Sequence, residues 1–280
     1  MKIVVGVKNY AEAEAFIRAG ADELYGGLAA VPNHRLPNMS FQEPEELKAA
    51  VRLARARGRR FSFLINQPCF GAGYETTLAA VRELDDAGVS ACIVRELPML
   101  ELLRAQKLRA MLTVSSLALC FNLPAMRRFK QLGAGRVILP FHITPQEAAP
   151  LIRNPYGLET EVFFNADFCC VNMDPACRLF SLTKAGQTCR FSYDGPGGRW
   201  RMPEPAVPQK LRSDYDFFHC GAPAVKIVRR RDFSESMEAY RFARTLGRLL
   251  EKGVSFPDFL RLGSKLYFNV TRNKLTCGKS

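Results

Sequence analysis

Four cysteines lie in one short segment, where their thiolates could bind a metal ion or an iron–sulfur cluster. They are Cys169, Cys170, Cys177 and Cys189. A strand-like apolar run, Leu158 to Phe164, leads directly into this segment, and a loop rich in proline and glycine follows it. Thiolates gathered just past a strand end favour a metal site over ordinary core packing. The regular cysteine spacing of a zinc ribbon is absent, so the spacing alone does not identify the metal.

The number of cysteines and the chain's apolar pattern indicate the cellular compartment of the protein. The sequence holds nine cysteines, an odd number, and its first residues, MKIVVGVKNYAEAEAF, lack the basic–apolar–small order of a signal peptide. No charge-free apolar run reaches the ~18 residues of a membrane span. We therefore expect a cytoplasmic protein with no membrane partner, whose reduced thiols are available for metal ligation rather than for a disulfide framework.

The chain is strongly basic, since Lys plus Arg exceed Asp plus Glu by 40 − 27 = 13. Such a surplus is typical of a protein that binds nucleic acid or an anionic small molecule. The alternative is a solvated basic surface with no partner. The densest basic runs, Arg52–Arg60 and Arg229–Arg231, are not interleaved with aromatic residues as single-strand binding surfaces usually are.

One pattern recurs along the chain: an amphipathic helix, a glycine where it stops, a short link and an apolar strand. Continuous apolar runs are typical of parallel strands that are covered on both faces. Eight such units in 280 residues predict a single-domain α/β fold, a (β/α)8 TIM-like barrel; a doubly wound open sheet is the runner-up. The predicted strands are Ile3–Val7, Glu23–Gly26, Phe61–Ile65, Ala91–Arg95, Ala110–Ser115, Arg136–Leu139, Leu158–Phe164 and Ala224–Val228.

The seventh unit departs from the pattern. Prolines and glycines leave little room for a long helix between Ser181 and Leu211. Long loops in compact domains are usually functional or disordered, and this one carries the cysteines, so we interpret it as functional. We expect a barrel domain over residues 1–253, with the cysteine-bearing loop 165–212 inserted after strand 7, and a C-terminal tail of mixed pattern over 254–280.

A barrel would place some cysteines at one open end and others at the opposite end. The carboxyl ends of its parallel strands meet at one open end, here called the mouth. A cluster or zinc site needs about four thiolates within a few ångströms. Cys177, Cys189 and one of the adjacent Cys169 and Cys170 are the expected ligands. The fourth is open: Cys277 on the tail is the first choice and Cys69 the second, with Cys120 and Cys220 also candidates. Cys92 and Cys220 are expected near the opposite end as packing residues.

Polar residues at the predicted strand ends form a second candidate set, for binding substrate. An arginine there would present a fork-shaped partner to a carboxylate or phosphate. Alternatively, Ser115 and Asn122 only cap backbone, and Arg95 and Glu96 neutralise each other. Lys226, Arg229 and Arg230 would add positive charge at the same mouth, whereas His34 reads as a loop residue. The predicted substrate-binding residues are Asn66, Arg95, Ser115, Asn122 and Lys226, with Glu96 and His142 nearby.

The sequence resembles the collagenase-like peptidase family, peptidase family U-32, over most of residues 1–250. The matching segments are GADELYGG, FLIN, VSSLALCFN, RVILP, EVFFNADFCC with Cys177, TCRFSY and VKIVRR. Several members of that family bind a [4Fe-4S] cluster through four cysteines. The resemblance implies that Cys169 or Cys170, Cys177 and Cys189 match cluster positions, that Ser115 and Asn122 match polar positions after strand 5, and that Lys226 matches the strand-8 lysine.

The resemblance also has departures. The family's usual histidine and glycine before the first cysteine are Asn165 and Ala166 here, its glutamine after strand 5 is Leu117, and its common arginine after strand 6 is Phe141. The spacing from Cys169 to Cys177 is one residue longer than usual. These changes bear on the substrate and activity more than on the fold and cluster.

Three functions are compatible with the sequence. The first, which the resemblance implies, is an iron–sulfur barrel protein, with zinc as the alternative metal, that supports oxygen-independent hydroxylation of a small aromatic or an RNA base. The second is a non-catalytic RNA-binding subunit or partner of a second protein of the same family. The third, a peptidase, is least favoured, because no Ser/His/Asp set, HExxH motif or evident Cys–His pair is visible.

Overall fold

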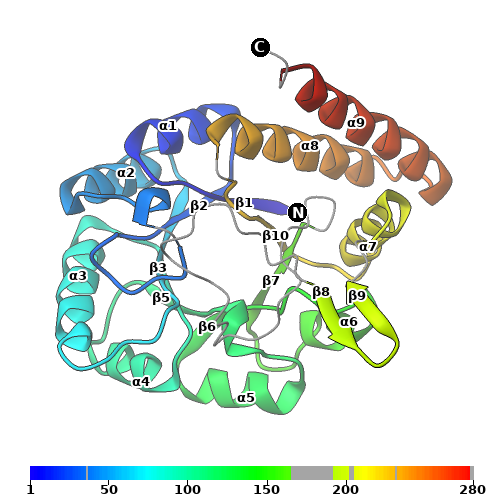
Figure 1. The fold of residues 1–280 in the computed structure, drawn as a ribbon. Helices are drawn as coiled ribbons and strands as arrows, with labels where there is room; N and C mark the ends of the chain where they lie inside the picture. The colour runs from blue at the N-terminus through cyan, green and yellow to red at the C-terminus, as the bar shows by residue number, and fades with distance from the viewer. Residues whose placement is uncertain (36, 165–191, 202–204, 231, 278–280) are drawn as a thin grey trace.

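The protein folds as a closed barrel of parallel strands surrounded by helices, seen in a computed structural model that describes residues 1–35, 37–164, 192–201, 205–230 and 232–277. The strands follow the order β1-β10-β7-β6-β5-β4-β3-β2 and close with the parallel pair β1 and β2. Figure 1 looks onto the carboxyl ends of the strands, with the helices outside the ring. The predicted (β/α)8 barrel is therefore confirmed, and the open sheet is excluded by the closure.

All eight predicted strands form. Short apolar runs become strands because both their faces are covered, one by the helices and one by the barrel interior. Their observed ends lie within a few residues of the predicted ones. The strands are β1 (Lys2–Gly6), β2 (Glu23–Gly26), β3 (Arg60–Ile65), β4 (Ala91–Val94), β5 (Met111–Val114), β6 (Ala134–Ile138), β7 (Glu159–Phe163) and β10 (Ala224–Ile227).

The helices begin and end at the residues that favour such positions. Proline stands in the first turn of α2, α4, α5, α6 and α7, where its missing N–H costs nothing. Gly20 ends α1 with φ of 90°, a left-handed conformation that residues with a Cβ rarely adopt. The helices are α1 (Tyr10–Ala19), α2 (Pro44–Ala56), α3 (Gly73–Ala87), α4 (Leu97–Ala105), α5 (Leu123–Gln131), α6 (Pro145–Ile152), α7 (Val207–His219), α8 (Phe233–Glu251) and α9 (Phe256–Cys277).

Arginines from neighbouring helices close several of these helix ends. The Nη1 group of Arg244 donates to the carbonyls of Ala19 and Gly20 at the end of α1, at 2.8 Å each. Arg104 likewise donates to the Gln131 carbonyl at the end of α5 at 2.9 Å. The last carbonyls of a helix lack partners within it and carry partial negative charge, so a cation there is favourable. Part of the arginine surplus thus serves the fold.

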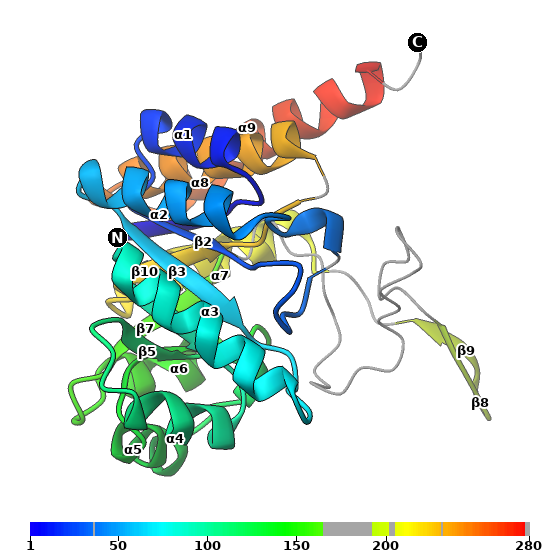
Figure 2. The same cartoon turned by 90° about the vertical axis from the view of Figure 1, so that its left-hand side faces the viewer.

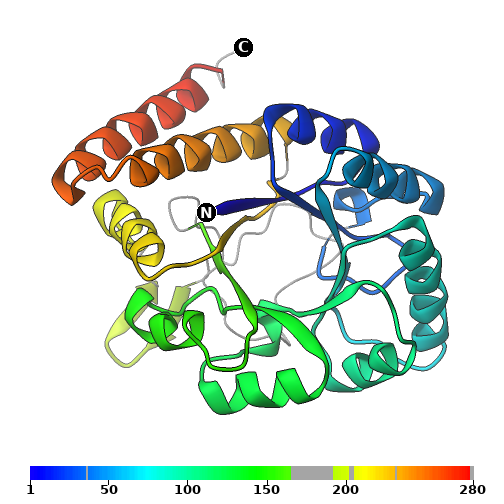
Figure 3. The same ribbon diagram turned by 180° about the vertical axis from the view of Figure 1, so that it is seen from behind.

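Two elements in the second half of the chain were not predicted from the sequence, the hairpin before α7 and the helix at the end of the chain. Residues 165–191, which hold four of the predicted ligands, lie outside the described residues. The chain resumes in an antiparallel hairpin, β8 (Ser192–Gly195) and β9 (Gly198–Arg201), which stands away from the barrel on the mouth side (Figure 2). The tail forms the 22-residue helix α9, which packs on α7 and α8 outside the barrel (Figure 3).

The barrel contains two apolar clusters. The larger one lies between the strands and the helices. The smaller one lies inside the ring and includes Val4, Tyr25, Leu64, Ile93 and Ile138, with Phe163 packed against it. Side chains alternate between the two faces of a strand, so residues two positions away from these also point inward. The interior is therefore filled with side chains, and chemistry is confined to the strand ends.

Candidate substrate-binding site at the mouth

The structure brings Asn66 and Arg95, two predicted residues of the mouth, close to His34. His34, in the loop after β2, donates its backbone N–H to Asn66 Oδ1 at 2.9 Å. Burial lowers the pKa of His34, and the nearby charge of Arg95 lowers it further. The imidazole is consequently neutral at pH 7 and can exchange hydrogen bonds without adding charge.

Arg95 keeps its charge available. In the described part of the chain, no carboxylate lies within ion-pair distance of its guanidinium. The neighbouring Glu96 accepts the backbone N–H of Cys69 at 3.0 Å instead of pairing with Arg95. A half-buried guanidinium without a described counter-charge is suited to bind a carboxylate or phosphate. Mutual neutralisation of Arg95 and Glu96 is therefore not observed.

Ser115 and Asn122 hold the backbone of the loop after β5. The Ser115 hydroxyl accepts the Leu117 N–H at 3.3 Å, and the Asn122 side chain accepts the Ala125 N–H at 2.9 Å, where α5 begins. Both are caps of the ordinary kind. Ser115 is buried whereas Asn122 is exposed, so of the two only Asn122 is accessible from solvent.

Lys226 and Arg229 carry charges that are already compensated inside the protein. Lys226 Nζ lies 2.9 Å from Glu161 Oε1 and 3.7 Å from the centre of the Tyr25 ring. The Arg229 guanidinium pairs with Glu12 through two nitrogens. The sequence suggested that both would add positive charge to the mouth. The structure instead places each in a buried ion pair, so neither contributes a free cation.

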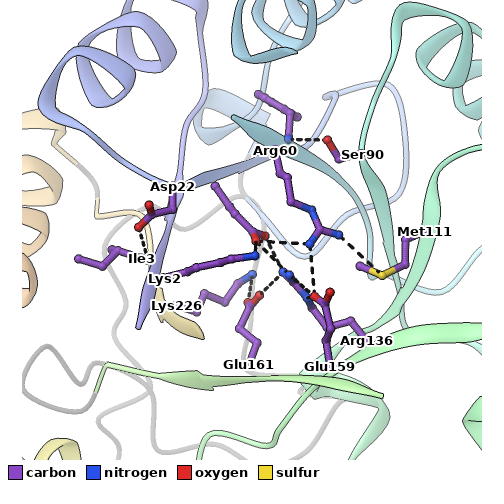
Figure 4. A network of polar contacts seen from close by, with 12 residues as sticks. Lys2, Ile3, Asp22, Arg60, Ser90, Met111, Arg136, Glu159, Glu161 and Lys226 are labelled. Carbon is purple, nitrogen blue, oxygen red and sulfur yellow. Dashed lines mark hydrogen bonds and ion pairs between the residues drawn. The ribbon is translucent and has the colours of Figure 1, made fainter. Parts of the chain in front are cut away.

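The Lys226–Glu161 pair belongs to a larger ion network in the amino-terminal half of the barrel (Figure 4). Arg136 on β6 donates to Glu23 on β2 at 2.6 Å and to Glu161 on β7 at 3.2 Å. Burial alone would raise the pKa of Glu23, but the hydrogen bond and charge of Arg136 outweigh it and lower the pKa. The Glu23 carboxylate is thus held ionised inside the ring, and its ion pair with Arg136 lies beneath the mouth.

Arg35 is a mouth residue that sequence reasoning missed. Its Nη1 group donates to the carbonyls of Val7 at 3.0 Å and Met39 at 3.3 Å, and its guanidinium lies 4.7 Å from the centre of the Tyr25 ring. Gly6 at the end of β1 makes room for it, because a Cβ there would overlap Arg35 Nη2. The available signal was a glycine at one strand end and an arginine in the loop after the next strand.

Aromatic rings line the opposite side of the mouth. Phe141, in the loop after β6, contacts Phe163 at the end of β7 with ring centres 4.6 Å apart, and it also contacts His142 at 5.7 Å. Phe141 stands where the resembling family commonly has an arginine. The change from arginine to Phe141 therefore removes a cation from this side of the mouth. It leaves an aromatic surface that lies across the mouth from the cationic residues.

Each described cysteine is packed separately. Cys69 is buried and its thiol lies 3.7 Å from the Thr77 hydroxyl, and burial raises the pKa of that thiol. Burial raises the pKa of Cys120 to about 11 and that of Cys92 to about 12. The Cys220 thiol donates to the Pro145 carbonyl at 3.6 Å. Each of these four thiols is thus surrounded by its own packing neighbours, and none lies in a described group of three possible metal ligands.

The predicted metal ligands remain predictions. Cys169, Cys170, Cys177 and Cys189 lie outside the described residues. Cys277 is the last residue of α9 and lies in its final stretch, 268–277, for which only the backbone is described. Within the described residues, no three His, Cys, Asp or Glu side chains form a group that could hold a metal ion. The last described residue before this segment, Phe164, follows β7 at the mouth.

Comparison with known proteins identifies the family. The family model described as "Peptidase family U32" matches residues 8–254, which is most of the chain. The chain belongs to peptidase family U32. Its structure is similar to that of the U32 peptidase Mk0906, with a TM-score of 0.57 and 18% sequence identity over 83% of this chain and 94% of that one. At this identity, the likeness shows a shared fold.

Two further proteins resemble this U32 chain. The tRNA hydroxylation protein P of Escherichia coli (strain K12) is 24% identical over 163 residues, 58% of this chain and 35% of that protein, so the match spans about a third of the relative. A 2,3-dimethylmalate lyase of the PEP mutase/isocitrate lyase superfamily shares the fold, with a TM-score of 0.51 and 10% identity over 99% of this chain and 93% of that one.

Two observations limit other functions of the U32 chain. His219 is next to Cys220 in sequence, but its Nδ1 contacts the Tyr215 carbonyl at 2.8 Å while the Cys220 thiol points to Pro145, so the two do not form a nucleophile–base pair. Among the described residues, none of the helices combines the length and apolar character required to cross a bilayer.

Proposed function

We propose that this U32 chain binds a segment of RNA at its mouth and supports oxygen-independent hydroxylation of a base in that segment. The observation that carries the proposal is the similarity to the tRNA hydroxylation protein P over 163 residues. The family assignment supports it, as does the mouth, where Arg95 has no described carboxylate partner. RNA is a polyanion, and arginine forks match phosphate oxygens in geometry and charge.

The chemistry of the mouth suits an unstacked base with its phosphate. An RNA base that leaves its stack is usually received on aromatic side chains and read by hydrogen bonds at its edge. The Phe141–Phe163 side supplies the aromatic surface. Neutral His34 and the amide of Asn66 supply hydrogen-bonding groups on the other side. Arg95 would then orient the anionic backbone beside the base.

The cofactor in this proposal is a [4Fe-4S] cluster, with zinc as the alternative metal. Cys177, Cys189, one of Cys169 and Cys170, and Cys277 would hold it, since thiolates are the donors that such clusters use. A bound cluster would supply one-electron redox chemistry. Cys69, Cys92 and Cys120 are buried in the apolar core and are not assigned to the cluster in this proposal.

The metal can be tested by anaerobic purification of the wild type and of Cys177→Ala and Cys189→Ala, with iron and acid-labile sulfide measured per chain. Cys92→Ala is the matched control, because this cysteine is buried in β4 and is not among the predicted ligands. We expect about four irons per chain in the wild type and the control, and a large loss in the two loop variants. Equal iron in all four proteins, or none in any, would refute the cluster.

The reaction can be tested on tRNA from a strain that lacks this gene. We expect one nucleoside to lose the mass of a single oxygen atom in the deletion strain. Wild-type protein and Cys92→Ala should restore that mass, whereas Cys189→Ala should not. An unchanged nucleoside profile after deletion would contradict the hydroxylation role.

The second candidate is a non-catalytic RNA-binding subunit that works with another protein of the family. The specific observation in its favour is Phe141, which stands where the family commonly has an arginine and instead packs on Phe163. This candidate predicts that purified protein binds tRNA with a steep dependence on salt but restores the nucleoside only together with its partner. Restoration by this chain alone would contradict it.

A further inference from the structure

The guanidinium of Arg35 is held in place without a counter-charge. Its Nη1 group is fixed by two backbone carbonyls, those of Val7 and Met39. Among the described residues, no carboxylate lies within ion-pair distance of it. Carbonyls orient a guanidinium but leave its net charge intact, so the site retains a full positive charge in a half-buried position.

The surroundings increase this excess of charge. Glu12 is paired with Arg229 and forms no described ion pair with Arg35, and the charge of Arg229 also acts on Arg35. Burial lowers the pKa of Arg35, and the charge of Arg229 lowers it further, although Tyr25 and Glu12 oppose the change. An anion placed beside Arg35 would be attracted to its guanidinium.

The absence of a side chain at Gly6 leaves the space that the Arg35 guanidinium occupies. Gly6 pairs in register with Tyr25, and a Cβ at Gly6 would overlap Arg35 Nη2 and lie 2.8 Å from Arg229 Cβ. The guanidinium is thus laid against the backbone of β1, with the Tyr25 ring 4.7 Å from its central carbon. A group held this rigidly loses little conformational freedom when it binds a ligand.

We propose that Arg35 is an anion-binding residue of the mouth and that the anion it takes is a phosphate group. That this phosphate belongs to RNA rests on the proposed function, whereas the phosphate site itself does not. The competing explanation is purely structural: Arg35 ties the loop after β2 to the end of β1 through its two carbonyl contacts. Both explanations predict a loss of stability when Arg35 is replaced, so stability alone cannot separate them.

The dependence of stability on phosphate separates them, because a ligand that binds only the folded protein raises its melting temperature with concentration. We would measure melting in increasing inorganic phosphate, with chloride at matched ionic strength and pH as the reference. Arg244→Gln is the matched control, since Arg244 also donates to two carbonyls beside a glycine and lies near a tyrosine, but outside the mouth.

We expect phosphate to stabilise the wild type and Arg244→Gln by equal, saturable increments. Arg35→Gln should weaken phosphate binding by about tenfold or more, the usual value of a charge-assisted hydrogen bond, and Arg35→Lys should keep part of it. An increment that survives intact in Arg35→Gln, or that is absent from the wild type, would overturn the proposal.

Two further arms identify the source of the anion. Acetate at the same ionic strength tests a carboxylate ligand, and stabilisation by acetate without phosphate would overturn the assignment. Nucleoside 5′-monophosphates compared with the free nucleosides test the link to RNA, and we expect only the monophosphates to depend on Arg35. If the tRNA assay fails while the inorganic phosphate increment still depends on Arg35, the site is upheld and the hydroxylation role alone is lost.

Discussion

Replacing Arg136 with methionine should destabilise the barrel more than any surface change, because it removes the centre of the buried ion network. Removing one partner of a buried ion pair typically costs 3–5 kcal/mol. We expect a cost near the lower end of this range, because both buried carboxylates would retain another cation after the substitution. Glu161 would still pair with Lys226 at 2.9 Å, and Glu23 with Lys2 at 3.4 Å. Glu159 is 46% exposed and its charge is screened by water. We therefore expect a loss of about 3 kcal/mol in the free energy of unfolding at pH 7.

The pH dependence provides a sharper check. The pKa of Glu23 is lowered in the folded wild type, so its contribution to stability is present above the unfolded pKa of about 4.3 and is lost as pH falls through the folded value. Without Arg136, burial raises the pKa of Glu23, and protonation relieves the buried charge. The penalty of Arg136→Met should accordingly shrink as the pH falls below about 5.

Urea unfolding followed by circular dichroism at pH 7.5 and pH 4.5 measures both effects. Arg136→Lys, which keeps the charge but not the fork, is the control and should lose less at neutral pH. Adding Glu23→Gln to Arg136→Met should recover part of the stability, because it removes the stranded charge. A penalty below about 1 kcal/mol at neutral pH, or one that is constant with pH, would refute this account of the network.

Three further changes test other parts of the structure. Gly6→Ala should cost about 1–3 kcal/mol in denaturant unfolding and weaken phosphate stabilisation, because its Cβ would displace Arg35; an unaffected variant would show that the loop yields freely. Arg95→Gln should leave the melting temperature nearly unchanged while reducing the salt slope of tRNA binding by about one, and an unchanged slope would remove Arg95 from the interface. Cys92 and Cys120, with pKa values of about 12 and about 11, should resist alkylation at pH 8 in the native protein and react on unfolding; fast native labelling of either would contradict their burial.

The barrel could be predicted because its signals are local. A glycine that ends a helix and an apolar run after it need no knowledge of the rest of the chain, and the closed ring confirms each strand. The helix α9 was missed, since polar residues and Gly263 interrupt its apolar pattern. That glycine lets α9 approach α7, because a Cβ there would lie 3.0 Å from Leu211, and this contact depends on tertiary packing.

The candidate site was less predictable because charge pairing depends on register. Lys226 pairs with Phe163 across β10 and β7, and this register sets its amine beside Glu161, two residues earlier on β7. A sequence shows that Lys226 follows an apolar strand but not which carboxylate it will meet. Arg35 was missed for the same reason, since its position follows from the register of Gly6 with Tyr25.

The surplus of 13 positive charges overstates the cationic surface that is available to a polyanion. Arg104 and Arg244 close helix ends, and Arg136 and Arg229 are buried in ion pairs. Net charge governs how fast and how loosely RNA associates, whereas positioned guanidinium groups decide where it is held. Because so many arginines serve the fold, specific binding at the mouth must depend on the few that lack described carboxylate partners there. The geometry of Arg35 and Arg95, and not the total charge, is therefore the property that distinguishes a binding site from a merely basic barrel.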